Sequence, residues 1–173
     1  MILILSTSLN AESNSRILAN EARVILSEEG HSVDFVDLRD VALPLCDGGP
    51  AYSHPEVARL SEHIKGADAI IVATPIYNYD ASAALKNAVE LTGKAWENKV
   101  VGFLCAAGGQ GSYMSIMSLA SSLMLDFRTV IVPRFVYATG SAFGDDRISD
   151  KEVAARVADL AHTTLRFGRA LKG

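Results

Sequence analysis

A polar loop near the start of the chain carries side chains that could bind an anion. It directly follows the apolar run Met1–Leu5, and its hydroxyl and amide groups lie where a helix is expected to begin: Ser8, Asn10, Ser13, Asn14 and Ser15. A helix N-terminus adds unpaired backbone N–H groups and a partial positive charge, which together suit a phosphate. Helix capping alone would need only one such residue. Arg16 is the only cation here, and its position inside the helix is expected to point it away, so the sequence predicts a neutral cradle.

A second loop, residues 74–80, follows the apolar run Ala69–Ala73 and contains Pro75, Ile76, Tyr77 and Asn78. Its flat side chains and backbone amides suit a planar aromatic ligand. A third loop, residues 106–112, is rich in glycine and includes Gly108, Gly109 and Gln110. Glycine permits close approach of the backbone, and exposed N–H groups there could stabilise negative charge on a reduced ring. The three loops together predict a phosphate-bearing planar cofactor.

The first loop lacks two common nucleotide-binding patterns. It contains neither the Walker A lysine motif nor G-x-G-x-x-G, which disfavours nucleoside triphosphates and classical dinucleotide binding. The chain also shows no Ser-His-Asp arrangement or carboxylate pair that would carry catalysis by itself, so no catalytic side chain is predicted.

The elements that must position these loops alternate along the chain. Apolar runs predict strands at Ile2–Leu5, Val33–Val36, Ala69–Ala73, Val100–Cys105 and Thr129–Val132. Helical periodicity predicts helices from Asn14 to a cap at Gly30, and over Pro55–Lys65, Ser82–Thr92, Ser112–Leu125 and Ser149–Leu171, with Ser149 or Asp150 as the last N-cap. Alternation of this kind indicates a parallel sheet covered on both faces. The common small solution has strand order 2-1-3-4-5, with its ligand site at the ends of strands one and three.

Composition narrows the class of protein. The chain has 173 residues, of which 49% are hydrophobic, and we expect one domain over residues 1–173. A formal net charge of −4 disfavours a nucleic-acid partner. No apolar stretch approaches the ~18 residues that span a bilayer, and no signal peptide is recognisable, so we expect a cytoplasmic protein without a membrane partner. Cys46 and Cys105 are interpreted as structural thiols, and no metal site is predicted from the cysteines or histidines.

Two segments leave alternatives open. The irregular stretch Val41–His54 is either a functional flap or a long crossover. The helix expected over Ser112–Leu125 is apolar on more than one face. It would therefore either pack against a second subunit or lie partly under the C-terminal segment. The apolar pattern favours the second subunit.

Two motifs resemble those of the NAD(P)H-dependent FMN reductase family. The spacing of Ser8, Asn10 and Ser13 is similar to that family's Gly-Ser-x-Arg-x-x-Ser phosphate loop. The stretch 74–78 followed by Leu85-Lys86-Asn87 is similar to its Pro-x-Tyr-Asn and Leu-Lys-Asn pattern, the more specific match. The chain departs from the pattern at four places: Thr7 stands for a glycine, Asn10 for an arginine, Ile76 for an acidic residue, and Ala83-Ala84 for Pro-Gly.

The resemblance implies a flavodoxin-like three-layer sandwich that binds FMN. The phosphate would contact Ser8, Asn10, Ser13 and Ser15, with Asn14 in the same loop. The ribityl chain and ring would contact residues 75–78, with Gly108, Gly109 and Gln110 on the pyrimidine side. NADPH or NADH would reduce the flavin, which would then reduce a small-molecule acceptor such as a quinone, free flavin, an azo compound or a metal oxyanion. A homodimer or dimer of dimers is also implied.

Two other functions fit the same fold. A flavodoxin-type electron carrier would bind FMN and exchange single electrons with protein partners, but the Thr-Gly-Asn/Thr phosphate loop and strongly acidic face typical of flavodoxins are not evident. The second alternative is a flavodoxin-like domain that has lost cofactor binding and serves as an interaction module.

Overall fold

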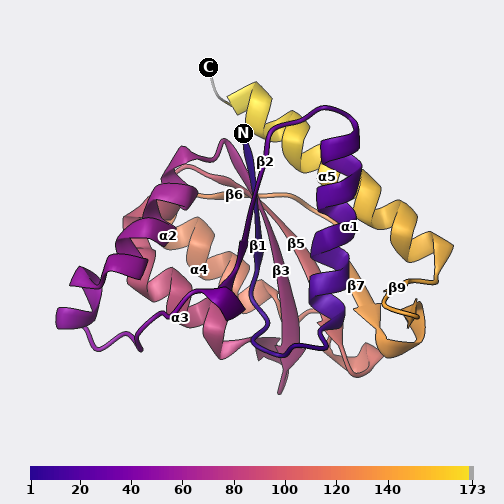
Figure 1. Ribbon diagram of the computed structural model, residues 1–173, viewed down its shortest axis with the longest axis horizontal. Coiled ribbons are helices and arrows are strands. Elements are labelled where there is room, and N and C mark those ends of the chain that lie inside the picture. The colour runs from indigo at the N-terminus through magenta and orange to yellow at the C-terminus, as the bar shows by residue number, and fades with distance from the viewer. Residues whose placement is uncertain (172–173) are drawn as a thin grey trace.

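The sheet follows the strand order expected from the alternation of elements. The computed structural model describes residues 1–171. Its central strands are β1 (Ile2–Ser6), β2 (Val33–Asp37), β3 (Ala69–Tyr77) and β5 (Val100–Ala107). With the short β6 (Val130–Ile131) they are parallel in the order β2-β1-β3-β5-β6 (Figure 1). Because β4 (Asp80–Ala81) is a short strand added beside β3, this order corresponds to the predicted 2-1-3-4-5. The predicted order is therefore confirmed.

The last position in the sheet is filled by two short strands instead of one. β6 (Val130–Ile131) pairs with the start of β5, and β7 (Val136–Thr139) pairs with its end. Between them, Pro133 has no N–H to donate and Arg134 has φ of 60°, so the ladder is interrupted. The predicted strand Thr129–Val132 corresponds to β6 alone, and β7 was not predicted.

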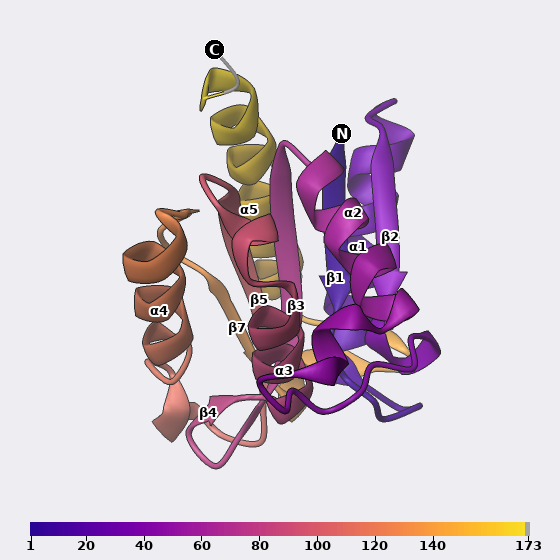
Figure 2. The same cartoon turned by 90° about the vertical axis from the view of Figure 1, so that its left-hand side faces the viewer.

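Helices cover both faces of the sheet, which makes three layers. α1 (Asn14–Glu28) and α5 (Lys151–Leu171) pack on one face through Leu18, Leu26, Val157 and Leu160. α2 (Pro55–Gly66), α3 (Ala83–Thr92) and α4 (Met117–Phe127) lie on the other (Figures 1 and 2). The C-terminal helix therefore does not cover α4, and that alternative is wrong. None of the helices in residues 1–171 is long and apolar enough to cross a membrane.

The ends of α1 and α5 agree with the predicted caps, α3 begins one residue after the predicted Ser82, and the start of α4 differs more. Ser82 Oγ accepts from the Leu85 amide at 3.3 Å, and Asp150 Oδ1 accepts from the Glu152 amide at 2.8 Å, so each begins its helix. Gly30 follows α1 with φ of 78°, a left-handed conformation that suits glycine. α4 begins at Met117 instead of Ser112, because a 3₁₀ turn over Gln110–Ser112 and further turns precede it.

The second predicted loop is a strand end followed by a tight hairpin. β3 continues through Tyr77 and pairs antiparallel with β4 (Asp80–Ala81), so that Tyr77 lies opposite Asp80. The two turn residues, Asn78 and Tyr79, have φ of 50° and 63°. Positive φ at both positions is the requirement of a two-residue hairpin whose twist matches its strands. Only the turn itself is loop, which shortens the segment predicted from sequence.

The long crossover between β2 and α2 is held by a side chain of α3. Asn87 Nδ2 donates to the Pro44 carbonyl at 2.9 Å, and its Oδ1 accepts from the Cys46 amide at 2.8 Å. Ala51 packs with Val57 and Leu91 beneath the same segment. These contacts favour a fixed crossover over a mobile flap, and they give the asparagine of the Leu-Lys-Asn motif a structural role.

We expect Asn87→Ala to lower the free energy of unfolding by about 1–3 kcal/mol, because two hydrogen bonds of roughly 0.5–1.5 kcal/mol each are lost. Urea denaturation followed by circular dichroism measures the change. Lys86→Ala is the matched control, because the Lys86 side chain is 54% exposed on the same helix. Equal effects of the two substitutions would contradict the anchoring role of Asn87.

Candidate functional site

One cavity collects residues from all three predicted loops. It has a volume of about 660 Å³ and lies where the first loop, the end of β3 and the end of β5 meet. All the predicted residues of the first two loops line it, together with Gly108. Gly109 and Gln110 are not among the lining residues. The position agrees with the rule that ligands bind beyond the carboxyl ends of parallel strands. The contacts of each residue with a ligand stay predictions.

Four lining residues were not predicted: Glu12, Ala106, Ala107 and Gly140. Gly140 directly follows β7, so it was not predicted because that strand was not predicted. Ala106 and Ala107 end β5, which runs two residues further than the predicted Val100–Cys105. Glu12 places an exposed carboxylate at the first loop, where a phosphate is predicted to bind. No lysine or arginine lines the cavity among the residues described, so the cradle carries no positive side chain.

The polar groups of the first loop are organised by hydrogen bonds within the loop. Ser13 caps α1 by accepting from the Arg16 amide, and its hydroxyl lies 2.9 Å from that of Ser15. The Asn10 side chain closes a turn with the backbone of Glu12, through bonds of 2.9 and 3.1 Å. Arg16 does not line the cavity, as expected, but its guanidinium turns back and bonds the loop backbone.

Buried hydroxyl groups join the first and second loops. Thr7 donates through Oγ1 to the Ala73 carbonyl at 3.0 Å, while its own amide donates to the same carbonyl at 2.9 Å. Thr74 Oγ1 donates to Ser82 Oγ at 3.3 Å, and Thr7 Oγ1 lies 3.4 Å from that oxygen. The threonine that replaces the family's usual glycine therefore links the phosphate cradle to the end of β3 and to the start of α3.

The third loop is held by Tyr137 of β7. Its hydroxyl donates to the Gly109 carbonyl and lies 2.6 Å from Ser112 Oγ. The Tyr113 ring meets the Tyr137 ring edge-on, with centroids 5.5 Å apart. The Gly109 carbonyl is thus turned toward Tyr137, consistent with the absence of Gly109 from the cavity lining.

The two cysteines lie outside the cavity. Both are free thiols, and Cys105 is fully buried in β5. Burial raises the pKa of the Cys105 thiol far above its ordinary value, which keeps it protonated and unreactive. Cys46 belongs to the anchored crossover. The interpretation as structural thiols agrees with both positions.

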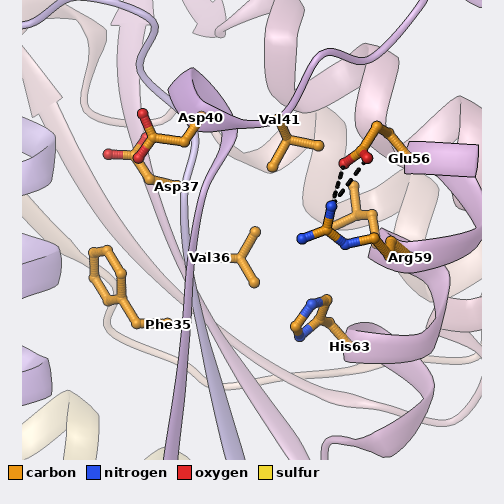
Figure 3. A pocket seen from close by; sticks show the side chains of 9 residues that line it. Phe35, Val36, Asp37, Asp40, Val41, Glu56, Arg59 and His63 are labelled. Atoms are coloured by element: carbon orange, nitrogen blue, oxygen red, sulfur yellow. Dashed lines mark hydrogen bonds and ion pairs between the residues drawn. The ribbon is translucent and has the colours of Figure 1, made fainter.

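A second, smaller hollow lies between β2 and α2, with a volume of about 320 Å³ (Figure 3). Its charged side chains have partners within the protein. Arg59 Nη1 lies 3.0 Å from Glu56 Oε1, and His63 Nδ1 lies 2.5 Å from Asp34 Oδ2. Asp37 Oδ2 lies 2.5 Å from Arg16 Nε. These charged groups are therefore already paired within the protein. The cavity at the strand ends is the better candidate.

The fold and the cavity together define a class: parallel α/β proteins with a ligand-sized cavity at the switch point of the sheet. Residues 1–144 match the model of the NADPH-dependent FMN reductase family. The chain belongs to this family, which confirms the resemblance drawn from the two motifs.

Relatives of the chain carry names that agree with this family. A protein from Geobacillus thermodenitrificans named NAD(P)H-dependent FAD/FMN reductase is 31% identical over 143 residues, covering 81% of this chain and 77% of the relative. A rice protein named probable NADPH:quinone oxidoreductase 2 is 26% identical and covers 99% and 90% of the two chains. Among solved structures, the flavoenzyme FerB from Paracoccus denitrificans superposes with a TM-score of 0.79 at 20% identity, covering 98% and 97%. That likeness shows the flavodoxin-like fold.

We expect Tyr137→Phe to loosen the third loop, since the Gly109 carbonyl and the Ser112 hydroxyl lose their partner. A loss of about 1 kcal/mol in local stability would speed amide exchange about fivefold. Hydrogen–deuterium exchange of peptides within residues 106–114 measures this. Tyr113→Phe is the control, because it removes a hydroxyl from the neighbouring ring. Unchanged exchange in Tyr137→Phe would show that this hydroxyl does not hold the loop.

Proposed function

We propose that this chain is a single-domain, FMN-dependent NAD(P)H oxidoreductase that passes reducing equivalents to a small acceptor such as a quinone or a flavin. The observation that carries the proposal is the union of the phosphate-type loop and the end of β3 in one cavity at the switch point. Membership of the FMN reductase family supports it.

The residues present fit FMN. Hydroxyl groups and the N-terminal amides of α1 supply the neutral donors that a phosphate can use in place of lysine. The buried Ser6 hydroxyl, directly before this loop, has no hydrogen-bond partner within the described residues. The cavity volume of about 660 Å³ lies within the usual range of ligand sites, roughly 300–1,000 Å³.

Each part of the site has its own task in the proposed reaction. Ser8, Ser13 and Ser15 would hold the phosphate, while Pro75 to Asn78 would position the ring beside the end of β3. The backbone of Gly108 would approach the pyrimidine edge. When bound, FMN supplies the hydride chemistry, accepting from the nicotinamide and delivering to the acceptor. The chain contributes binding, orientation and exclusion of water, and we assign no catalytic side chain.

Quinones are the acceptors that the relatives favour. The rice relative is named a quinone oxidoreductase, and a Burkholderia relative, 34% identical over 102 residues, is named 2-hydroxy-1,4-benzoquinone reductase. A planar acceptor suits a site whose ring-facing walls are backbone and flat side chains. Either NADPH or NADH is the expected reductant, and the cytoplasmic location stays a prediction from the sequence.

Anaerobic addition of NADPH to the FMN-loaded protein tests the proposal. We expect prompt loss of the oxidised-flavin absorbance and its return when a benzoquinone is added. NADH is tested in parallel. Flavin that binds but stays oxidised with both nicotinamides would favour the electron carrier. Failure to bind FMN would favour the domain without a cofactor.

We also propose a homodimer formed through α4. Its inward residues Leu119, Ala120 and Leu123 are buried against the sheet, but Leu125 is 86% exposed and Met124 is 39% exposed. Since α5 lies on the opposite face, the described chain leaves this apolar side uncovered. A groove of about 680 Å³ between α3 and α4 adjoins it, lined in part by Leu119 and Phe127. A second copy of the chain would bury both.

We expect Leu125→Glu to shift the dimer toward monomer, because a carboxylate would be buried without a partner at the interface. Size-exclusion chromatography with light scattering measures the mass at several concentrations. Val24→Glu is the control, since Val24 is 44% exposed on α1 across the sheet. Equal masses for the wild type and Leu125→Glu would rule out this interface.

A further inference from the structure

All the N–H donors of the Arg16 guanidinium are used in hydrogen bonds within the protein, and Arg16 does not line the cavity. Nη2 donates to the Ser8 carbonyl at 2.7 Å, and Nη1 donates to the carbonyls of Asn10 at 2.6 Å and Ala11 at 3.0 Å. Nε and Nη2 also donate to the two carboxylate oxygens of Asp37 at 2.5 and 3.3 Å. An arginine has five N–H donors, so none is left for a ligand.

We propose that Arg16, fixed by Asp37, is a positioning residue that shapes the first loop for a phosphate which it does not touch. The inference rests on the proposed function, since the phosphate is that of the flavin. It assigns to Arg16 the phosphate selectivity of the site.

The geometry of the peptide unit explains how the arginine can act. In a trans peptide the carbonyl and the following N–H point in opposite directions. Carbonyls of Ser8, Asn10 and Ala11 directed at the guanidinium therefore turn the amides of the next residues, Leu9, Ala11 and Glu12, away from it. Arg16 does not line the cavity, whereas Ser8, Asn10 and Glu12 do. The amides of Leu9 and Ala11 are thus presented on the side opposite the arginine.

Asp37 makes this arrangement rigid. It ends β2, and its Oδ1 also accepts from the Arg39 amide at 3.0 Å. The side chains of Arg16 and Asp37 are 13% and 7% exposed, so the pair is shielded from water. A planar fork that reaches a carboxylate and three carbonyls at once is specific to arginine, because lysine offers a single point of charge.

The ion pair also makes it possible to tell whether Arg16 acts through the geometry of its hydrogen bonds or through its charge. Asp37 neutralises the arginine, so the pair adds little net positive potential at the cradle. If Arg16 acted by attracting the phosphate, lysine would substitute for it. If it acts by orienting the loop, lysine will fail. Arg16→Lys keeps the charge and removes the fork, which makes it the decisive variant.

The binding experiment compares FMN with riboflavin, which lacks the phosphate, by fluorescence titration. We expect Arg16→Lys to weaken FMN binding at least tenfold while riboflavin binding changes less than threefold. Arg59→Lys is the control and should leave both unchanged, since Arg59 pairs with Glu56 on α2 and its side chain is 69% exposed (Figure 3). An unchanged ratio of the two affinities, or an equal loss of both, would overturn the proposal.

A second measurement does not depend on flavin. In the flavin-free protein, Arg16→Lys should speed amide hydrogen exchange across residues 9–12 and leave residues 70–76 of β3 unchanged. If the wild type binds neither flavin, the proposed function fails, while exchange still tests the role of Arg16. Unchanged exchange in the variant would overturn the positioning role even where FMN binds.

A double variant guards against misfolding. Arg16→Gln with Asp37→Asn removes both charges, so no buried charge is left without a partner. Circular dichroism checks that it is folded. It should lose the preference for FMN over riboflavin as Arg16→Lys does. A double variant that folds and keeps the wild-type preference would contradict the proposal.

Discussion

The parallel pairing of β1 with β3 is the constraint on which the site depends. The register sets Ser6, the last residue of β1, opposite Ala73, and β3 then runs on past the end of β1 to Tyr77. The Thr7 amide then extends the ladder by one bond to the Ala73 carbonyl. Because the strands diverge in the chain to helices on opposite faces, their ends open a crevice between them. The phosphate-type loop and the ring-type strand end meet there as a consequence of sheet order.

Much of this could be predicted from the sequence because it follows from periodicity. Buried parallel strands such as Ala69–Ala73 are continuous apolar runs, and their alternation with helices leaves few topologies. The fifth strand position was harder, since Pro133 divides it into two short pieces that no single apolar run reveals. Gly140 was not predicted to line the cavity because β7, which precedes it, was not predicted. The hairpin at Asn78 and Tyr79 was also hidden, because positive φ at these residues is imposed by strand pairing.

Side-chain contacts between residues far apart in the chain were harder to predict from the sequence than the strands and helices. Nothing in the pattern around Asn87 shows that its amide reaches Pro44 and Cys46, more than forty positions away. The turn of Arg16 toward the loop was likewise not foreseen, because helical position alone does not say that Asp37 ends the neighbouring strand close by. Such contacts depend on tertiary packing, and they decide which groups of a loop remain free for a ligand.

The arrangement of the first loop favours phosphate binding by orientation over binding by charge. Its only lining charge among the residues described is the Glu12 carboxylate, which repels a phosphate, and Asn10 is occupied with the Glu12 backbone. In the proposed site, attraction of a phosphate would come from hydroxyls, backbone amides and the dipole of α1, each of which is strong only when correctly directed. A site of this kind gains more from a rigid backbone than from an added cation. The buried pair of Arg16 and Asp37 and the hydroxyl bridge of Thr7 provide that rigidity from the two sides of the loop.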